Sequence, residues 1–267
     1  MKLFSLAFIG FLLHFSALAQ SDTSSNWSVS IGAGYYLSGE QAIDYYSGND
    51  NGRLALLFNK NTQQYNQILV DFDGYPFYLD GAPSDLIYRN TGSFELALEY
   101  QLPKDLFLNF SFYNVTLDVT GLFTIRVDRA NQNGNPQPFQ AIGEIKGREK
   151  RSHIVFSFGK SFDLKNNFYF NASGGVDLNF VESLSNQALI EGRDYNIQRA
   201  ISLTQRAQAI TTIGYGFIGD AKIGYQIQGA YGFFLKTSFL YSNINVNDIS
   251  NGQTPILIPG IGFTKEF

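Results

Sequence analysis

The sequence of 267 residues contains no cysteine. This absence excludes disulfide bonds, thiolate catalysis and cysteine-ligated zinc or iron–sulfur sites. Only two histidines are present, which argues against a histidine-ligated metal site, and we expect no cofactor. The formal net charge of −4 argues against a general nucleic-acid binder, because such proteins are basic. Past the N-terminus, no stretch supplies the roughly 18 consecutive apolar residues of a membrane-spanning helix.

Aromatic and small residues are abundant. The chain has 25 phenylalanines, 16 tyrosines and 26 glycines, and 44% of its residues are hydrophobic. This is enough apolar material for a folded chain. The length fits one domain of the barrel or sandwich type, or at most two ordinary domains.

Residues 1–19 have the pattern of a secretory signal peptide. Lys2 supplies the positive charge, the apolar segment runs from Leu3 to Leu13, and Ala17 and Ala19 are small residues at the expected cleavage positions. An N-terminal anchor helix is the alternative, although the apolar segment is short for a membrane span. We therefore expect a signal peptide at 1–19, a short periplasmic segment at 20–26 and one folded domain at 27–267.

Long segments alternate strictly between apolar and small polar residues. The clearest segment is 167–180, where one face is apolar and the other consists of Asn, Ser, Gly, Asp and one Tyr. A period of two predicts a β-strand with one apolar face. The runs exceed the roughly 5–6 residues of an ordinary soluble strand and match the roughly 9–11 of a membrane-crossing strand. A small polar inward face and aromatic strand ends are typical of outer-membrane barrels. A soluble β-sandwich is the alternative.

Short and long links alternate along the chain, as in an up-and-down barrel with short periplasmic turns. The short links are 103–105, 163–166 and 228–230, and the long links are about 39–52, 74–91, 121–149, 182–207 and 243–254. The sequence therefore predicts an all-β, antiparallel transmembrane barrel of about ten strands, with both termini on the periplasmic side. The predicted strands are 27–38, 53–60, 64–73, 91–102, 105–119, 150–162, 167–181, 208–227, 231–243 and 256–267. Twelve strands would follow if 121–149 hides a hairpin of Phe123–Val127 with Ala141–Ile145, and eight if 53–73 lies outside the wall.

The last strand ends in an aromatic residue. Phe267, Phe263 and Ile261 share one face, which Lys265 interrupts. This pattern resembles the terminal strand of Gram-negative outer-membrane β-barrel proteins, in particular porin-like families with few characterised members. The resemblance implies that these three residues form the signal for the barrel-assembly machinery and that the protein resides in the outer membrane. It implies nothing specific about activity.

Two sets of charged residues follow from the predicted strands. Inward-facing charges of opposite sign should pair in a narrow lumen, because isolated charges there are costly; these are Glu95, Glu99, Asp177, Asp220, Lys222 and Lys236. The outcome is either a plugged barrel or a thin conduit. A basic extracellular loop is predicted from Arg126, Arg129, Lys146, Arg148, Lys150 and Arg151. It could contact lipopolysaccharide phosphates or draw anions to the mouth, or it could simply be solvated.

The sequence favours a non-enzymatic role, either as a small porin-like conduit or as a structural and surface-interaction barrel. The alternatives are a surface hydrolase or protease at the rim and a soluble ligand-binding sandwich. Asp71, Asp73 and His153 loosely resemble an omptin protease site, but Arg151 stands where the omptin pattern has Asp. Outer-membrane lipid, lipopolysaccharide and the assembly machinery are the expected partners, with no nucleic acid; the oligomeric state stays open.

Overall fold

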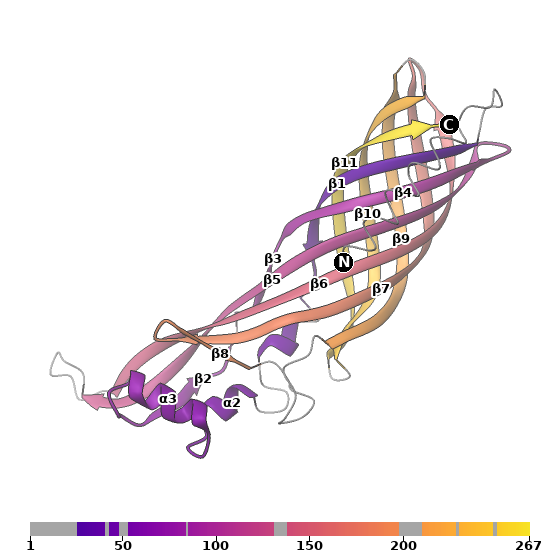
Figure 1. Ribbon diagram of the computed structural model, residues 1–267. Helices are drawn as coiled ribbons and strands as arrows, with labels where there is room; N and C mark the ends of the chain where they lie inside the picture. The colour runs from indigo at the N-terminus through magenta and orange to yellow at the C-terminus, as the bar shows by residue number, and fades with distance from the viewer. Residues whose placement is uncertain are drawn as a thin grey trace.

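Eight antiparallel strands close into a barrel (Figure 1). The computed structural model describes residues 26–40, 43–47, 53–83, 85–130, 138–197, 210–227, 230–247 and 250–267, so the expected signal peptide lies outside the described residues. The ring order is β1 (Trp27–Ser38), β4 (Thr91–Leu102), β5 (Leu106–Ala130), β6 (Pro138–Asp163), β7 (Phe168–Ile190), β9 (Ile210–Gln226), β10 (Tyr231–Asn247) and β11 (Ser250–Glu266). Strand β1 pairs with both β4 and β11, which closes the ring. The predicted antiparallel barrel is confirmed, and the soluble sandwich is wrong.

The predicted count of ten strands is wrong, and the alternative of eight is correct. Residues 53–73 form α2 (Arg53–Leu57) and α3 (Gln63–Asp71) outside the ring. Helix α3 begins after Thr62, whose side chain accepts a hydrogen bond from the Tyr65 amide. Leu54 and Leu57 are buried three residues apart, as are Tyr65 and Ile68, which is the helical spacing. A short apolar run fits the repeat of a helix as well as the repeat of a strand, so the pattern of this segment could not distinguish the two.

The twelve-strand alternative contained one correct pairing. Residues 123–127 pair with 139–143 of the opposite strand, close to the proposed hairpin, but as continuations of β5 and β6. These two strands run for 25 and 26 residues. The expected long loop 121–149 is therefore mostly a pair of extended strands, and it adds no strand to the ring.

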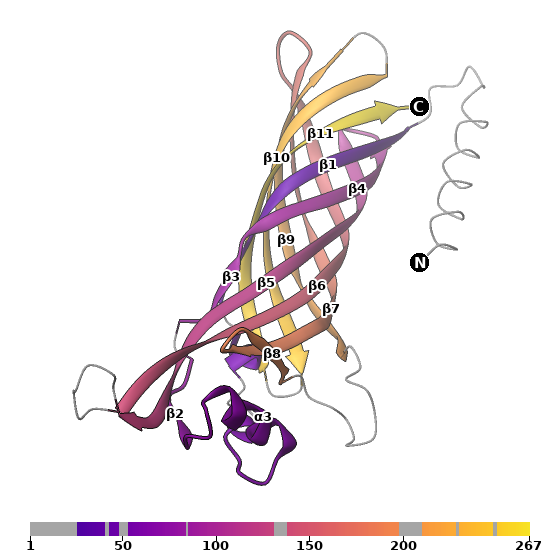
Figure 2. The same cartoon turned by 60° about the vertical axis from the view of Figure 1, so that its left-hand side comes forward.

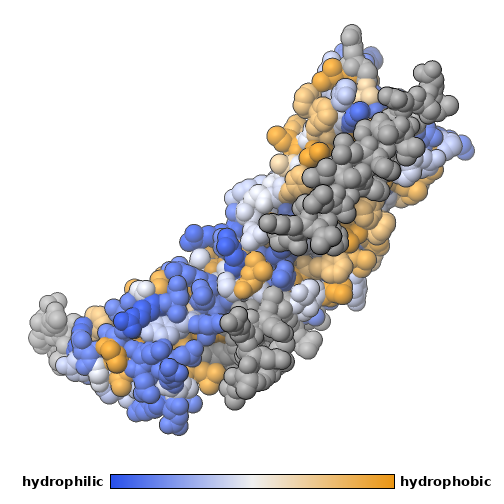
Figure 3. All heavy atoms as spheres, viewed as in Figure 1, coloured by the Kyte–Doolittle hydropathy of each residue, from blue (hydrophilic) through white to orange (hydrophobic). Residues whose placement is uncertain are grey.

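The outward face of the ring is apolar, as the alternation predicted (Figure 3). Phe168 and Leu178 are 44% and 42% exposed, so neither points into a packed interior. One outward row crosses six neighbouring strands through Phe94, Ala33, Ile261, Leu235, Ile223 and Phe170. Together with outward residues of the other two strands, such as Phe110 of β5 and Phe156 of β6, which are 41% and 52% exposed, this row forms a broad apolar band.

One end of the barrel has short turns and the other carries an extension. The turns 103–105 and 164–167 are tight, and Lys104, Asp105, Asn166 and Asn167 adopt positive φ. At the far end β5, β6 and β7 continue past the ring (Figures 1 and 2). Strands β2 (Phe77–Gly81) and β3 (Ile87–Arg89) pair with β5, and β8 (Arg193–Asn196) pairs with β7. Parts of the predicted links 74–91 and 182–207 are thus strands, and so is most of the predicted link 243–254, which belongs to the ends of β10 and β11.

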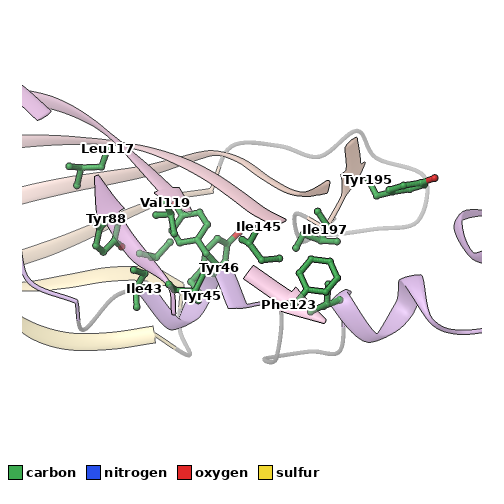
Figure 4. Close-up of a cluster of buried hydrophobic side chains, with 14 of the residues drawn as sticks. Ile43, Tyr45, Tyr46, Tyr88, Leu117, Val119, Phe123, Ile145, Tyr195 and Ile197 are labelled. Carbon is green, nitrogen blue, oxygen red and sulfur yellow. The ribbon is translucent and has the colours of Figure 1, made fainter. Parts of the chain in front are cut away.

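Helices cover one face of this extension. Three helical elements cover a buried hydrophobic cluster: the 3-10 helix η1 (Ile43–Ser47), α2 and α3. The cluster includes Tyr65, Phe72 and Phe77, and the rings of Tyr65 and Phe77 are stacked with their centres 4.5 Å apart. Figure 4 shows Tyr46 and Tyr88 beside Val119 within the cluster. The buried cluster makes the extension a small domain continuous with the wall. In the described residues, no helix is long and apolar enough to cross a membrane.

Two glycines of β6 allow aromatic rings to lie against the extended strands. A Cβ at Gly143 would lie 2.1 Å from the Phe123 ring, which belongs to its cross-strand partner. A Cβ at Gly147 would lie 2.2 Å from the Tyr46 ring of η1. The absence of a side chain at these two positions therefore leaves room for the Phe123 and Tyr46 rings against β6.

Candidate functional site

The barrel interior holds three groups of charged and polar side chains. The first group, the lysine layer, is nearest the short turns. Lys236 Nζ lies 2.6 Å from Glu95 and 3.6 Å from Asp220, and it donates to the Tyr113 hydroxyl at 2.7 Å. Lys222 pairs with Glu99 at 2.9 Å. Five of the six predicted lumen charges therefore form two clusters, and each cluster joins a lysine to carboxylates.

The second group, the histidine layer, contains the sixth charge. Asp177 lies 3.0 Å from Nδ1 of His153, and the Tyr36 hydroxyl lies 3.0 Å from its Nε2. The Ser242 hydroxyl donates to Asp177, and Asn179 donates to Ser242 at 3.2 Å. All five side chains belong to residues with no solvent exposure. Asp177 is thus partnered by a histidine and not by a lumen lysine.

The third group, the arginine layer, joins the wall to the extension. Arg151 and Glu149 are both fully buried and lie 2.5 Å apart. Arg151 also donates to Ser38 at 2.8 Å and lies 4.8 Å from the centre of the Tyr88 ring. Glu149 accepts hydrogen bonds from Tyr46 at 2.8 Å and from Tyr88 at 3.3 Å. The layer therefore ties β3 and η1 to β6.

The predicted basic loop is not a loop. Its six residues lie on β5 and β6, and Arg151 is buried in the arginine layer. Four of the others have carboxylate partners: Arg126–Asp128, Arg129–Asp73, Lys146–Asp194 and Arg148–Asp118, at 3.1 to 3.7 Å. Exposed pairs of this kind contribute about 0–1 kcal/mol each. A single basic patch is therefore absent from the described part of these strands.

The sequence did carry a signal for the arginine layer. Glu149, Arg151 and His153 continue the same parity as the inward residues Val155 and Ser157. Extending the alternation toward the N-terminus would have placed all three inside. The tyrosines that meet them come from distant segments and give no local signal.

Space inside the barrel is concentrated at the short-turn end. A polar cavity of about 290 Å³ opens there, lined among others by Glu99, Lys222 and Glu266. Beyond it, the two further voids beside Lys236 measure about 20 and 10 Å³. Each is about the size of one water molecule. Farther along, Val155, Val181, Leu240 and Ile256 fill the interior with apolar side chains, where the alternation had predicted small polar ones.

The residues that loosely resembled an omptin site do not converge. Asp71 pairs with Arg193 at 2.9 Å and accepts a hydrogen bond from Tyr195 at 2.8 Å, which fastens α3 to β8. Burial and that hydrogen bond raise the pKa of Tyr195 to about 12. Asp73 lies on the same side of the extension, while His153 is enclosed in the barrel. Among the described residues, no three His, Cys, Asp or Glu side chains group as metal ligands would.

The predicted assembly residues lie on the closing strand. Ile261 and Phe263 point outward on β11 and are 62% and 38% exposed, and the Phe263 ring lies 5.5 Å from that of Phe233. The Phe267 amide donates to the Trp27 carbonyl at 3.0 Å, which joins the C-terminus to the first strand. Recognition by the assembly machinery stays a prediction.

These features define an eight-stranded antiparallel β-barrel with a filled interior and a helix-covered extension. No protein-family model matches the chain, and no curated protein is significantly similar to it.

Solved structures of Gram-negative outer-membrane β-barrels are similar to it. Neisserial surface protein A (NspA) is 11% identical, with a TM-score of 0.44, over 92% of this chain and 100% of that one. Ail of Yersinia pestis, in a complex with sucrose octasulfate, is 11% identical, with a TM-score of 0.38, over 91% and 99%. OprG from Pseudomonas aeruginosa is 10% identical, with a TM-score of 0.36, over 91% and 97%. Similarity at this level transfers no activity or partner.

Proposed function

We propose that this protein is an outer-membrane barrel that acts as a closed anchor, and that its work outside the cell is done by the extension. The proposed role is non-enzymatic, and it corresponds to the structural and surface-interaction barrel that the sequence predicted as one of two possibilities. The apolar outward band supports membrane insertion, since its exposed phenylalanines and tyrosines would be unfavourable in water. Outer-membrane lipid and the assembly machinery are then its immediate partners.

The filled interior is the observation that carries this proposal. A conduit needs a continuous path of solvated side chains, but the described interior is occupied by buried ion pairs, by the His153–Asp177 hydrogen-bond network and by apolar side chains such as Val155 and Val181 beside them. The Arg151–Glu149 and Lys236–Glu95 pairs are fully or almost fully buried, with Arg151 and Glu149 at 0% exposure and Lys236 at 8%. Removing such a charge from its partner is strongly unfavourable, so the layers should not part spontaneously.

Membrane residence is tested by gel mobility and protease protection. The protein folded into lipid vesicles should migrate differently before and after heating, and the barrel strands should resist added protease. A protein that stays soluble without detergent and shows one mobility would contradict the anchor.

Closure is tested by conductance in planar lipid bilayers. The folded protein should give no steady ion conductance, and an open porin in the same bilayer serves as the positive control. A reproducible single-channel step from the pure protein would favour the conduit instead.

The geometry gives less support to a rim hydrolase. His153 has no exposed surface, and its two ring nitrogens are already engaged by Asp177 and Tyr36. A substrate could not reach it without rearrangement of the barrel. We expect the purified protein to cleave neither peptides nor lipid esters; cleavage that disappears in His153→Ala while the folded fraction is unchanged would contradict the non-enzymatic proposal.

A further inference from the structure

The outward face changes from apolar to polar at nearly the same level of β5, β6 and β7. Below this level, Phe112, Ile154 and Leu178 form one outward cross-strand row. In the next row Asn114 and Ser152 are polar, and on β7 the change comes one row later, between Phe180 and Glu182. An apolar band that ends within two neighbouring rows on three strands is expected at a membrane surface. Everything farther along these strands therefore belongs above the membrane.

The strands above this level lean away from the barrel axis. Figures 1 and 2 both show the extension leaving the ring at a slant, with α2 and α3 on the side farther from the short turns. The helices thus cover the inner face of the extension. The other face, which continues the outward face of the wall, has no described element over it and overhangs the apolar band.

Exposed aliphatic side chains form a diagonal line across this overhanging face. Ile87 lies opposite Thr120, Leu122 is two residues farther along the same strand, and Ile142 lies opposite Thr124. Diagonal neighbours of this kind are within reach of each other across a sheet. Ile87, Leu122 and Ile142 are 52%, 54% and 69% exposed, so this line has no cover within the described chain.

Cations lie between this aliphatic line and the apolar band. Arg89 and Arg148 flank Asp118 in one cross-strand row, and Lys150 is two residues from Arg148 on the same face. Arg148 pairs with Asp118 at 3.1 Å, whereas no carboxylate of the described residues lies within ion-pair distance of Arg89 or Lys150. With Glu182 opposite Lys150, these two rows carry three cations and two carboxylates, which is one net positive charge, and Glu144 lies on the same face farther from the apolar band, opposite Leu122.

We propose that the overhanging face docks on the outer leaflet of the membrane that holds the barrel, on lipids with phosphate-bearing anionic headgroups. Arg89 and Lys150 contact the phosphates, and Ile87, Leu122 and Ile142 enter the headgroup region. Aliphatic and cationic side chains on one face are the combination that binds a membrane surface. The inference rests on the proposed membrane anchor. The slant of the extension relative to the wall is then fixed by lipid as well as by protein contacts.

A single introduced cysteine tests this docking, since the chain has none of its own. Ile142→Cys carries an environment-sensitive fluorophore on the overhanging face, and Val70→Cys carries it on the opposite side, at a residue of α3 that is 71% exposed. Both proteins are folded into vesicles of phosphatidylcholine with and without phosphatidylglycerol. Headgroup-labelled quencher lipid should quench the label at 142 far more than the label at 70, and more strongly in the phosphatidylglycerol vesicles.

A charge variant provides the second measurement. Lys150→Gln should lower the docked-to-undocked ratio of the 142 label by about five-fold, because one cation near an anionic surface contributes about that factor. Lys165→Gln, in the short turn at the other end, should leave the ratio unchanged. Equal quenching at 142 and 70, or equal quenching with and without phosphatidylglycerol, would overturn the docking.

Gel mobility in the same vesicles separates the two proposals. Heat-modifiable protein whose 142 label stays in water means that the anchor holds and the docking is wrong, which would leave this face for a protein partner. Protein that never becomes heat-modifiable means that the anchor itself has failed.

Discussion

Replacing Arg151 by methionine tests whether the arginine layer is a buried ion pair that the fold depends on. The change removes the contact with Glu149 at 2.5 Å, the hydrogen bond to Ser38 and the ring contact with Tyr88. Loss of one partner of a buried pair typically costs about 3–5 kcal/mol, since the other charge stays unpaired. Glu149 would keep its hydrogen bonds from Tyr46 and Tyr88, so we expect a cost of about 3 kcal/mol, at the lower end of that range.

A second substitution tests whether the unpaired charge of Glu149 causes the loss of stability. In Arg151→Met with Glu149→Gln no unpaired charge is left, and the glutamine carbonyl can still accept from the two tyrosines. The double variant should therefore be more stable than Arg151→Met alone, although it carries one more change. Stability is measured by urea unfolding of the protein in vesicles, followed by the fluorescence of Trp27, the only tryptophan of the chain.

Two results would refute this reasoning. A cost below about 1 kcal/mol for Arg151→Met would place the side chain in solvent in the membrane-bound protein. A double variant less stable than the single one would mean that packing, and not charge pairing, decides the energetics of the layer.

Three further predictions test other parts of the molecule. Phe217 lies in the middle of the outward band of β9, and Phe217→Arg should lower the free energy of unfolding by about 2–4 kcal/mol, while Phe217→Leu should have little effect. Equal urea midpoints for these two variants would contradict contact of residue 217 with lipid. Deletion of Phe267 should prevent assembly into the membrane fraction of cells, and Phe267→Tyr should assemble normally; normal assembly of the deletion would remove the C-terminal signal. The contact of α3 with β8 should weaken as pH rises from about 10 to about 12, because folding raises the pKa of Tyr195 above its ordinary value of about 10 and favours the neutral phenol. Hydrogen exchange of α3 would report this loss, and Tyr195→Phe should show no such pH dependence.

The strand faces were predictable from local patterns. Alternation placed residues such as Phe168 and Leu178 on the outward side, and the inward parity of Glu95, Asp177 and Lys236 followed from the same rule. Backbone geometry fixes this period, so it needs no knowledge of neighbouring strands. The short turn at 103–105 was equally local.

The number of strands and the presence of the helices were harder to predict from the sequence. Residues 53–73 contain apolar positions that fit a helix and a strand almost equally well, and only packing against Phe77 and the extended strands selects the helix. Whether a polar segment such as 121–149 is a loop or two extended strands depends on its cross-strand partner as much as on itself.

The sequence by itself determined that this chain builds long strands with an apolar and a polar side, because a strand's period of two acts within a few residues. The tertiary structure alone decided that eight strands close the ring and that the Tyr46 hydroxyl reaches the buried Arg151–Glu149 pair. Those outcomes depend on the register between strands and on contacts across more than a hundred residues, for which the chain carries no local pattern.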